Sequence, residues 1–539
     1  MAFLLTQGSS TLYKMDLSTG TATALTLPTG VTLSTTRKPK FALLNQWVAM
    51  VNSPTKNLLI DPEGTVSVLV PQAPLHGPSM VAGASTGLTG AYLYKISFMV
   101  KNSDGDILLE SPLSPASAST TLANQNASLT DIATSPDSIV TTRRLYRTLS
   151  GGTAYFHLFD IEDNTTTALI ENVADATVTL LTAAGSSLVS PPGTLPGIRL
   201  KNIIEWRSRF WAVADEPSLV DYIYVTDTNK VYAWPTRLVT PPTGQDEKGI
   251  IGFGRRKNQL GFVKRLGVWM VSAPANSTGI STSSMSVTQI GTEEQGGVAE
   301  DTILTVGDDV YYLGTQGVFE WSDRGIASIT DDSVKPWFST DTYFNRSRFP
   351  NAFARYNRVT NSYELHLANA GDSTENRWVS FNRNTRKWYG PHKTGALTPT
   401  HAGHLLDANG LPMTLVGGSD GVIYTGNSAN KRDGAATAID MDCQGPWHIG
   451  AGPDNFHTWQ QLTMLTKIEA AGTLEITPYT GWLDASAGTA ISHDQTLGRE
   501  LLRRLGNGRL ARLRIRKNTV NQSATIYGYE LPFFSNGRR

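Results

Sequence analysis

Short runs of alternating apolar and polar residues, separated by turn residues, dominate this sequence. LYKMDLSTGTATAL (12–25) and NLLIDPEGTVSVL (57–69) share one pattern: an apolar run, an aspartate, a glycine-containing turn, a threonine and a second alternating run. Alternation with a period of two predicts β-strands, and Asp, Gly, Asn or Ser between two such runs predicts a hairpin turn. We therefore expect Asp16 and Asp61 to open the turns of two hairpins.

Related hairpins recur through the chain at roughly 30–50 residues per unit, which gives about six or seven units. This spacing is typical of the four-stranded blades of β-propellers. The repeat is degenerate because a blade packs only on its neighbours, so it requires alternation rather than fixed residues. Helical periodicity is nearly absent, and RELLRRLGNGRL (499–510) is the best helix candidate despite its glycines. The further hairpins are 203–215 with 221–234, 258–272, 308–330, 354–368 with 377–390, and 412–426.

Two stretches differ from the repeats in their residue pattern. Between the proline-rich segments PQAPLHGP and SPPGTLPG, the runs AYLYKISFMV, TTRRLYRTL and TAYFHLFDI read as strands of a small antiparallel sandwich. The last hundred or so residues read as long strands of a separate sheet. The sequence thus predicts an all-β protein: a β-propeller, an inserted immunoglobulin- or fibronectin-like β-sandwich and a C-terminal β domain. The predicted domains are 1–75 and 196–441 (propeller), 76–195 (insertion) and 442–539 (C-terminal domain).

Composition and charge exclude several classes of protein. The 46 basic and 46 acidic residues cancel, so no global field attracts nucleic acid or a membrane surface. One cysteine, Cys443, cannot form an intramolecular disulfide, which suits maturation in a reducing cytoplasm, and we expect its thiol to be inert. The N-terminus lacks the basic region of a signal peptide, and no window approaches the roughly 18–20 apolar residues of a membrane span. We expect a soluble protein.

Three fragments match catalytic or zinc motifs only in part. GASTG (83–87) fits the nucleophile-elbow pattern, but Ser85 lies in a Gly/Ser/Thr-rich stretch without the helix that an elbow requires. His401 and His404 form HAGH without a carboxylate at zinc spacing, so we interpret them as loop residues. SDRGIASI and SDGVIYTG lack the spacing and the tryptophan of sialidase-type turns, so nothing indicates the paired carboxylates of a glycosidase.

NSDGDILLE (102–110) has part of the pattern of a calcium loop. Asn102, Asp104 and Asp106 alternate as calcium ligands would, but isoleucine stands where the loop needs glycine, and Glu110 closes it too early. The Asp-Gly pair between alternating runs favours a hairpin. We predict no metal and no cofactor.

Adjacent aspartates in VGDDVYYLGTQGVFEW (306–321) raise the question of acid/base chemistry. Asp308 and Asp309 follow TILTV and Gly307, and two aromatic-rich runs come after them. This order favours a hairpin turn between strands, with the aromatic residues filling space between blades. We therefore predict that the chain is not an enzyme.

The order of these sequence patterns along the chain resembles that of a known family. The run EEQGGVAEDTILTVGDDVYYLGTQGVFEWSDRGIASITDDSVKPWF (293–338) resembles a blade of bacteriophage tail β-propeller proteins, the nozzle or tail-tubular proteins of short-tailed phages. FNRNTRKWYG (381–390) is similar to a recurring hairpin of that family, and the 76–195 segment resembles fibronectin-type insertions of virion proteins. The resemblance covers most of 196–440 and, more loosely, the rest.

The resemblance implies a structural virion protein without enzymatic activity, assembled in the bacterial cytoplasm and located in the virion tail. Six copies would form a ring below the head-to-tail adaptor, with viral DNA passing through the channel without sequence-specific binding and with fibres, spikes or a needle attached. Alternatives are a receptor- or glycan-binding tail fibre and a tail-associated glycosidase propeller.

One basic feature remains as a candidate interaction site. Arg512, Arg514 and Arg516 alternate with Leu513 and Ile515, so a strand would place the three guanidinium groups on one face. Contact with phosphate and a charged subunit interface are the functional interpretations. A solvated strand face is the structural alternative, and zero net charge makes direct DNA binding the least favoured of these.

Overall fold

The structure is a computed structural model that divides into two compact units, Met1–Ala352 and Phe353–Arg539. Each unit holds its own sheets and buried clusters. The structure describes the chain except for residues 1–2, 17–18, 20, 70, 72, 102–104, 106, 138, 179–198, 217–218, 220–221, 227, 230, 232–233, 235, 240–248, 273–285, 395–396, 407–411, 427–431, 434–436, 439–440, 445–447, 449–456, 467–472, 482–489, 496, 498, 509, 518–525 and 536–539.

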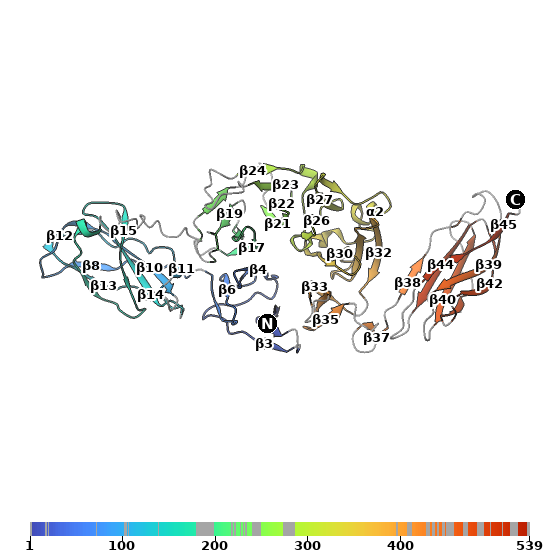
Figure 1. The fold of residues 1–539 in the computed structure, drawn as a ribbon, viewed down its shortest axis with the longest axis horizontal. Helices are drawn as coiled ribbons and strands as arrows, with labels where there is room; N and C mark the ends of the chain where they lie inside the picture. The colour runs from blue at the N-terminus through green and yellow to red at the C-terminus, as the bar shows by residue number, and fades with distance from the viewer. Residues whose placement is uncertain are drawn as a thin grey trace. The chain divides into compact units, whose positions relative to one another are not determined.

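Five sheets of the first unit are antiparallel meanders, in which each strand pairs with the next along the chain (Figure 1). Their turns follow from local chemistry. Asp61 Oδ1 accepts hydrogen bonds from the N–H groups of Gly64 and Thr65, both at 2.7 Å, and Gly64 has a φ of +99° that suits glycine. The turn predicted at Asp61 is confirmed. The sheets are β1–β3 (Phe3–Gly8, Thr11–Asp16, Ala22–Ala24), β4–β7 (Lys40–Leu44, Trp47–Val51, Leu58–Ile60, Val66–Val68), β17–β20 (Leu200–Glu205, Phe210–Ala214, Tyr222–Val225, Thr236–Val239), β21–β24 (Ile250–Arg256, Gln259–Lys264, Val268–Ser272, Ser286–Gln289) and β25–β28 (Leu304–Val306, Asp309–Leu313, Val318–Ser322, Gly325–Ser328).

Consecutive meander sheets pack face to face. Phe262 of β22 lies in one buried cluster with Trp211 of β18, whereas the next residue, Val263, lies in another cluster with Trp321 of β27. Successive side chains of a strand point to opposite faces, so the β21–β24 sheet is buried on both sides. The same packing joins β1–β3 to β4–β7 and β4–β7 to β17–β20. Aromatic residues therefore fill the space between sheets, as predicted.

Residues 79–171 form sheets of their own, placed in the sequence between β7 and β17. One core, which includes Tyr94, Leu129 and Leu145, serves all of these sheets. The β4–β7 and β17–β20 sheets on either side nevertheless pack directly on each other, with Val51 and Phe210 in one cluster. The sheets have the strand orders β11-β10-β14-β15, β12-β9 and β16-β13-β8, with β8 Ser79–Ala82, β9 Leu88–Tyr92, β10 Tyr94–Lys101, β11 Ile107–Glu110, β12 Thr120–Gln125, β13 Ala127–Thr130, β14 Thr142–Thr148, β15 Tyr155–Ile161 and β16 Leu169–Glu171.

The second unit begins with two more meander sheets and ends with two sheets that share a core. Phe353 packs with Ala402 and Val416 between the meanders, and Leu462, Leu474 and Leu513 belong to the C-terminal core. The meanders are β29–β32 (Phe353–Asn357, Ser362–Leu367, Arg377–Asn382, Lys387–Lys393) and β33–β35 (Pro399–Leu406, Pro412–Gly418, Ile423–Gly426); β36 Arg432–Asp433 pairs with β37 Thr437–Ala438; the final sheets are β38-β43-β40-β41 (Met441–Gln444, Leu510–Lys517, Thr473–Gly481, Ile491–Asp494) and β42-β39-β44 (Arg499–Gly508, His457–Thr466, Ile526–Glu530), with β45 (Phe533–Ser535) on β39.

Helices are few and short in the described residues. Those with full bounds in the described residues are α2 (Lys335–Ser339) and the 3₁₀ turns η3 (Glu293–Gln295), η4 (Glu300–Thr302) and η5 (Arg346–Asn351), and residues 175–178 are also helical. The predicted all-β class is therefore confirmed, whereas the four predicted domain boundaries stay predictions.

Two local predictions were wrong. The best helix candidate, 499–510, forms β42 over Arg499–Gly508 and begins β43 at Leu510. Pairing with β39 satisfies the main chain of β42, and Leu502 is buried in the C-terminal core. His401 and His404 lie in β33 rather than in a loop, since the whole segment pairs with β34. In both places a partner strand distant in sequence decides the conformation.

The aspartate pair at 308–309 lies at a hairpin turn, as predicted. Val306 pairs with Asp309 across Gly307 and Asp308, and Gly307 has a φ of +64°. Glycine at the first of two turn residues is typical of the tight hairpin turns that match strand twist. Asp308 is exposed, and Asp309 is the first residue of β26. The pair therefore marks a turn.

Candidate functional site

The predicted arginine stripe lies on β43, an interior strand between β38 and β40. Leu513 and Ile515 are buried in the C-terminal core, while Arg512, Arg514 and Arg516 between them are partly exposed. The alternation read from the sequence is therefore the alternation of the strand. What this face binds stays a prediction.

Acidic and aromatic residues on the neighbouring strands lie beside the arginines of the stripe. The strand register places Asp442 of β38 and Glu475 of β40 on either side of Arg516. The Arg512 guanidinium lies over the ring of Tyr479, 5.0 Å from its centre, in a cation–π contact. One end of the stripe thus faces acidic positions, and the other is held against an aromatic ring.

Reversing the charge at the middle of the stripe tests whether the stripe is a charged subunit interface. We expect Arg514→Glu to change the free energy of unfolding by no more than about 1 kcal/mol, because a partly exposed side chain contributes little to folding. At a charged subunit interface, the same change lowers the oligomeric mass measured by light scattering. Arg499→Glu, at a position outside the stripe, is the control. An unchanged mass for Arg514→Glu would contradict a subunit interface and leave phosphate contact and a solvated strand face.

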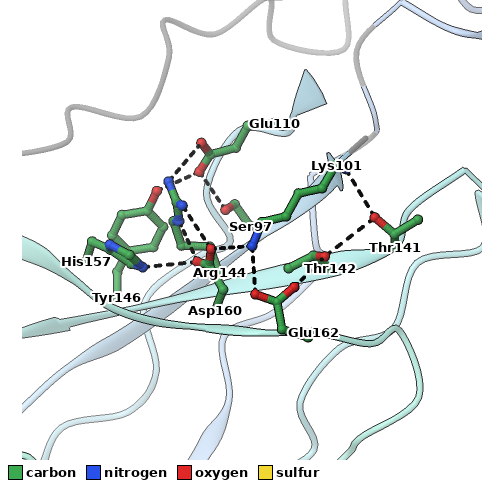
Figure 2. Close-up of polar contacts among 10 residues, drawn as sticks. All are labelled: Ser97, Lys101, Glu110, Thr141, Thr142, Arg144, Tyr146, His157, Asp160 and Glu162. Atoms are coloured by element: carbon green, nitrogen blue, oxygen red, sulfur yellow. Dashed lines mark hydrogen bonds and ion pairs between the residues drawn. The ribbon is translucent and has the colours of Figure 1, made fainter. Parts of the chain in front are cut away.

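A denser polar cluster occupies one face of the β11-β10-β14-β15 sheet (Figure 2). Its origin is the run TTRRLYRT, which places Thr142, Arg144 and Tyr146 on that face, while Leu145 points into the core. Every residue of β14 is buried, although the strand carries polar side chains on both of its faces. Buried polar groups require hydrogen-bond partners, so the other strands must supply them.

Glu110 closes one side of this cluster. Its Oε1 accepts hydrogen bonds from Ser97 Oγ at 2.8 Å and Tyr146 Oη at 2.6 Å, and its Oε2 lies 3.8 Å from Arg144 Nη1 (Figure 2). Burial, followed by the Glu110 charge, raises the pKa of Tyr146. The side chain considered as a calcium ligand is thus engaged within the sheet. Asn102, Asp104 and Asp106 lie outside the described residues.

Asp160 of β15 is the centre of the cluster. Arg144 donates to both of its carboxylate oxygens, at 2.7 and 3.0 Å, Lys101 Nζ lies 2.8 Å away, and His157 Nε2 lies at 3.0 Å. Lys101 also donates to Glu162 at 2.7 Å. Burial raises the pKa of Asp160, but the hydrogen bonds from His157, Arg144 and Lys101 outweigh it and hold the pKa well below its usual range. The cluster therefore holds a carboxylate that stays ionised at neutral pH beside Arg144 and Lys101.

The depressed pKa of Asp160 predicts acid sensitivity of this sheet. A carboxylate whose pKa is lower in the folded than in the unfolded state stabilises the fold above about pH 4, and this contribution is lost as the pH falls further. We expect Asp160→Asn to cost about 1.5–3 kcal/mol at neutral pH, the value of hydrogen bonds to a charged group. The variant is also expected to show a shallower loss of stability below about pH 4.

Hydrogen exchange of the amides of β14 and β15, followed from neutral to acidic pH, measures both effects. Glu162→Gln is the matched control, because the Glu162 side chain is 66% exposed. If the wild type and Asp160→Asn lose stability equally below about pH 4, Asp160 does not cause the acid sensitivity.

A second buried network lies on the core side of the same sheet. Arg147 Nη1 donates to both oxygens of Glu171, at 2.8 and 2.9 Å, and its Nη2 donates to Asp175 at 2.8 Å. Tyr94 Oη donates to Glu171 at 2.6 Å. The side chains of Arg147 and Glu171 have no exposed surface. The network ties β14 and β10 to β16.

Ion pairs also join the β4–β7 sheet to the start of the β25–β28 sheet. Lys40, the first residue of β4, pairs with Asp301 of η4, and its Nζ lies 3.1 Å from Glu300 Oε1. Lys38 Nζ lies 3.1 Å from Asp301 Oδ2. Burial raises the pKa of Glu300 and the Lys40 charge opposes it, with a net rise. In the described part of the chain these sheets share no buried apolar cluster, yet their first strands begin close together.

A hydrogen-bonded row resembling a nucleophile, base and acid is present in the C-terminal domain. His493 Nε2 lies 3.0 Å from Thr466 Oγ1, and His493 Nδ1 lies 2.5 Å from Glu500 Oε2. His493 has no exposed surface and Thr466 is 3% exposed, so a substrate has no access to the hydroxyl. The row is a structural link between β39, β41 and β42. No motif reveals it, because its members come from three separate strands.

The remaining candidates do not assemble into a site. Ser85 is exposed in a bend without a helix after it, as predicted. Cys443 lies in β38 opposite Ile515, and the inertness of its thiol stays a prediction. Among the described residues, no group of three or more His, Cys, Asp or Glu side chains is placed to hold a metal ion.

Comparisons with known proteins add little. No helix in the described part of the chain is long and apolar enough to span a membrane. The chain resembles two solved structures at low TM-scores: PorZ, an essential bacterial surface component of the type-IX secretion system of Porphyromonas gingivalis (10% identity, 99% of this chain and 80% of that chain, TM-score 0.27), and apo AztD from Citrobacter koseri (9%, 58% and 97%, TM-score 0.20). Likenesses this weak carry no conclusion about function. No protein-family model and no curated protein matches the chain.

Proposed function

We propose that the chain is a structural virion protein, the subunit of a ring-shaped tail nozzle in a short-tailed bacteriophage. In this proposal residues 1–75 and 196–441 are the β-propeller predicted from the sequence. Residues 76–195 are the fibronectin-like insertion, and residues 442–539 are a further β domain. The resemblance of residues 293–338 to the blades of nozzle proteins supports this assignment.

One observation carries the propeller part of the proposal. Lys40 and Lys38 pair with η4, so the first strands of the β4–β7 and β25–β28 sheets begin close together. Two further sheets, β17–β20 and β21–β24, lie between them in the face-to-face stack. A flat stack would keep these strand ends apart, whereas blades arranged around an axis bring their inner strands together. The ion pairs therefore favour the radial arrangement.

The role in this proposal is mechanical. Buried charges such as those of Arg147 and Asp160 are paired inside the sheets, which suits a rigid wall better than an open catalytic cleft. A ring of identical subunits repeats one heterologous interface and leaves no subunit edge unpaired. Its partners would be the head-to-tail adaptor and the fibres, spikes or needle, with viral DNA passing through the channel.

Mass and shape test the proposal. Light scattering and negative-stain microscopy of the purified chain, alone and with the adaptor of its phage, are expected to give a ring of six copies. A stable trimer would contradict the nozzle and favour a fibre or spike. Cleavage of host polysaccharide by the chain, abolished by replacing one Asp or Glu, would favour a glycosidase instead.

A further inference from the structure

A cavity of about 560 Å³ lies where the inserted segment meets the first two meander sheets. Its walls come from the stretch after β3, from the β6–β7 turn and strand, and from residues 137 and 139 before β14. The volume is within the range of small-molecule sites, which often occur where separate structural modules meet. All of these elements belong to the first unit.

Asp137 is the buried polar group of this cavity. The residue is 6% exposed, and its Oδ2 is buried without a hydrogen-bond partner. Its Oδ1 faces Lys56 Nζ at 3.7 Å, which is too long for a hydrogen bond. An unsatisfied carboxylate oxygen in an interior is costly. A donor entering the cavity would satisfy it.

The rest of the lining defines the chemistry of that donor. Asp137 and Glu63 are the charged residues of the lining, which contains no basic side chain. Leu25, Leu27, Val66 and Ile139 supply an aliphatic wall. The buried Asp137 carboxylate favours a cation, and the apolar wall favours a hydrocarbon stem attached to it.

We propose that this cavity is a binding site for an aliphatic ammonium or guanidinium group, which donates to Asp137 Oδ2 and packs its stem on the aliphatic wall. Such a group occurs in free polyamines and in lysine or arginine side chains of a partner protein. The bound group would hold the inserted segment against the β1–β3 and β4–β7 sheets. This inference does not depend on the proposed virion function.

Ligand-observed saturation-transfer NMR on the full chain tests the site. The probes are butylammonium, its neutral analogue butanol, spermidine, and blocked single lysine and arginine residues. We expect butylammonium to bind and butanol to bind at least about tenfold more weakly, the effect of losing a charged hydrogen bond. Hydrogen exchange is expected to show protection around residues 137–140 when butylammonium is present.

Three variants locate the interaction. Asp137→Asn keeps the shape of the side chain and is expected to weaken butylammonium binding at least about tenfold. Thr65→Trp, at an exposed residue of the lining, fills the mouth of the cavity and is expected to abolish binding. Asp131→Asn, whose side chain is 68% exposed in the same segment, is the control and keeps full binding. Circular dichroism verifies that each variant is folded.

The probes also distinguish the two sources of the ligand. Binding of the blocked amino acids together with butylammonium supports a partner side chain, whereas binding of butylammonium and spermidine alone supports a free amine. The proposal is overturned if no amine binds, if butanol binds as well as butylammonium, or if folded Asp137→Asn retains full affinity.

Discussion

Replacing Arg147 by alanine is expected to lower the free energy of unfolding of the inserted sheets by about 3–5 kcal/mol, the cost of breaking a buried ion pair from one side. Glu171 would keep its charge with no exposed surface and without the two hydrogen bonds from Arg147. Asp175 and the carbonyl of Val173 would also lose donors. Hydrogen exchange over β14 and β16 measures this loss locally.

Tryptophan fluorescence separates this effect from the rest of the molecule. None of the 12 tryptophans lies between residues 76 and 195, so their emission reports on the other sheets alone. Arg147→Met combined with Glu171→Leu is expected to cost less than the sum of the two single changes, because neither charge is then left alone. Additive costs would show that the two side chains do not stabilise each other.

Replacing Trp211 by alanine is expected to cost about 3–5 kcal/mol, as is usual for a fully buried tryptophan. Trp211 is 0% exposed, donates its indole N–H to the carbonyl of Trp206 at 3.1 Å, and packs against the ring of Trp206. It fills the space between the β17–β20 and β21–β24 sheets. Urea unfolding followed by tryptophan fluorescence provides the measurement.

The control for Trp211 is Trp337→Ala. Trp337 is half-buried in the short helix α2, so its truncation creates a smaller cavity and a smaller loss of stability. Similar costs at the two positions would contradict the view that packing between sheets dominates the stability of the stack.

Local sequence was sufficient to predict the strands and turns whose cause lies in a few neighbouring residues. Asp61 and Gly307 create turns through their own side-chain or backbone properties, so a window of a few residues reveals them. The alternation of Leu513 and Ile515 with arginines likewise predicted which side of β43 is buried. In each case the physical cause is contained in neighbouring residues.

Features that depend on distant partners could not be predicted in this way. Arg147 and Glu171 are 24 residues apart, and nothing in either stretch indicates that their side chains meet in a core. The 499–510 stretch has helix-forming residues, but its pairing with β39 prevails. Asp137 is an ordinary aspartate in the sequence and becomes notable only because folding buries its carboxylate beside a cavity.

The position of the inserted sheets has a consequence for synthesis on the ribosome. About 130 residues separate Val68 from Leu200, so at about 5–20 residues per second the β4–β7 sheet emerges roughly 10 s before β17, the first strand of its packing partner. During this delay Val51 and Leu59 lack the neighbours that later cover them. The inserted sheets, whose contacts are local, can fold in the interval, and nascent-chain stalling before residue 200 should trap a folded insertion beside an incomplete stack.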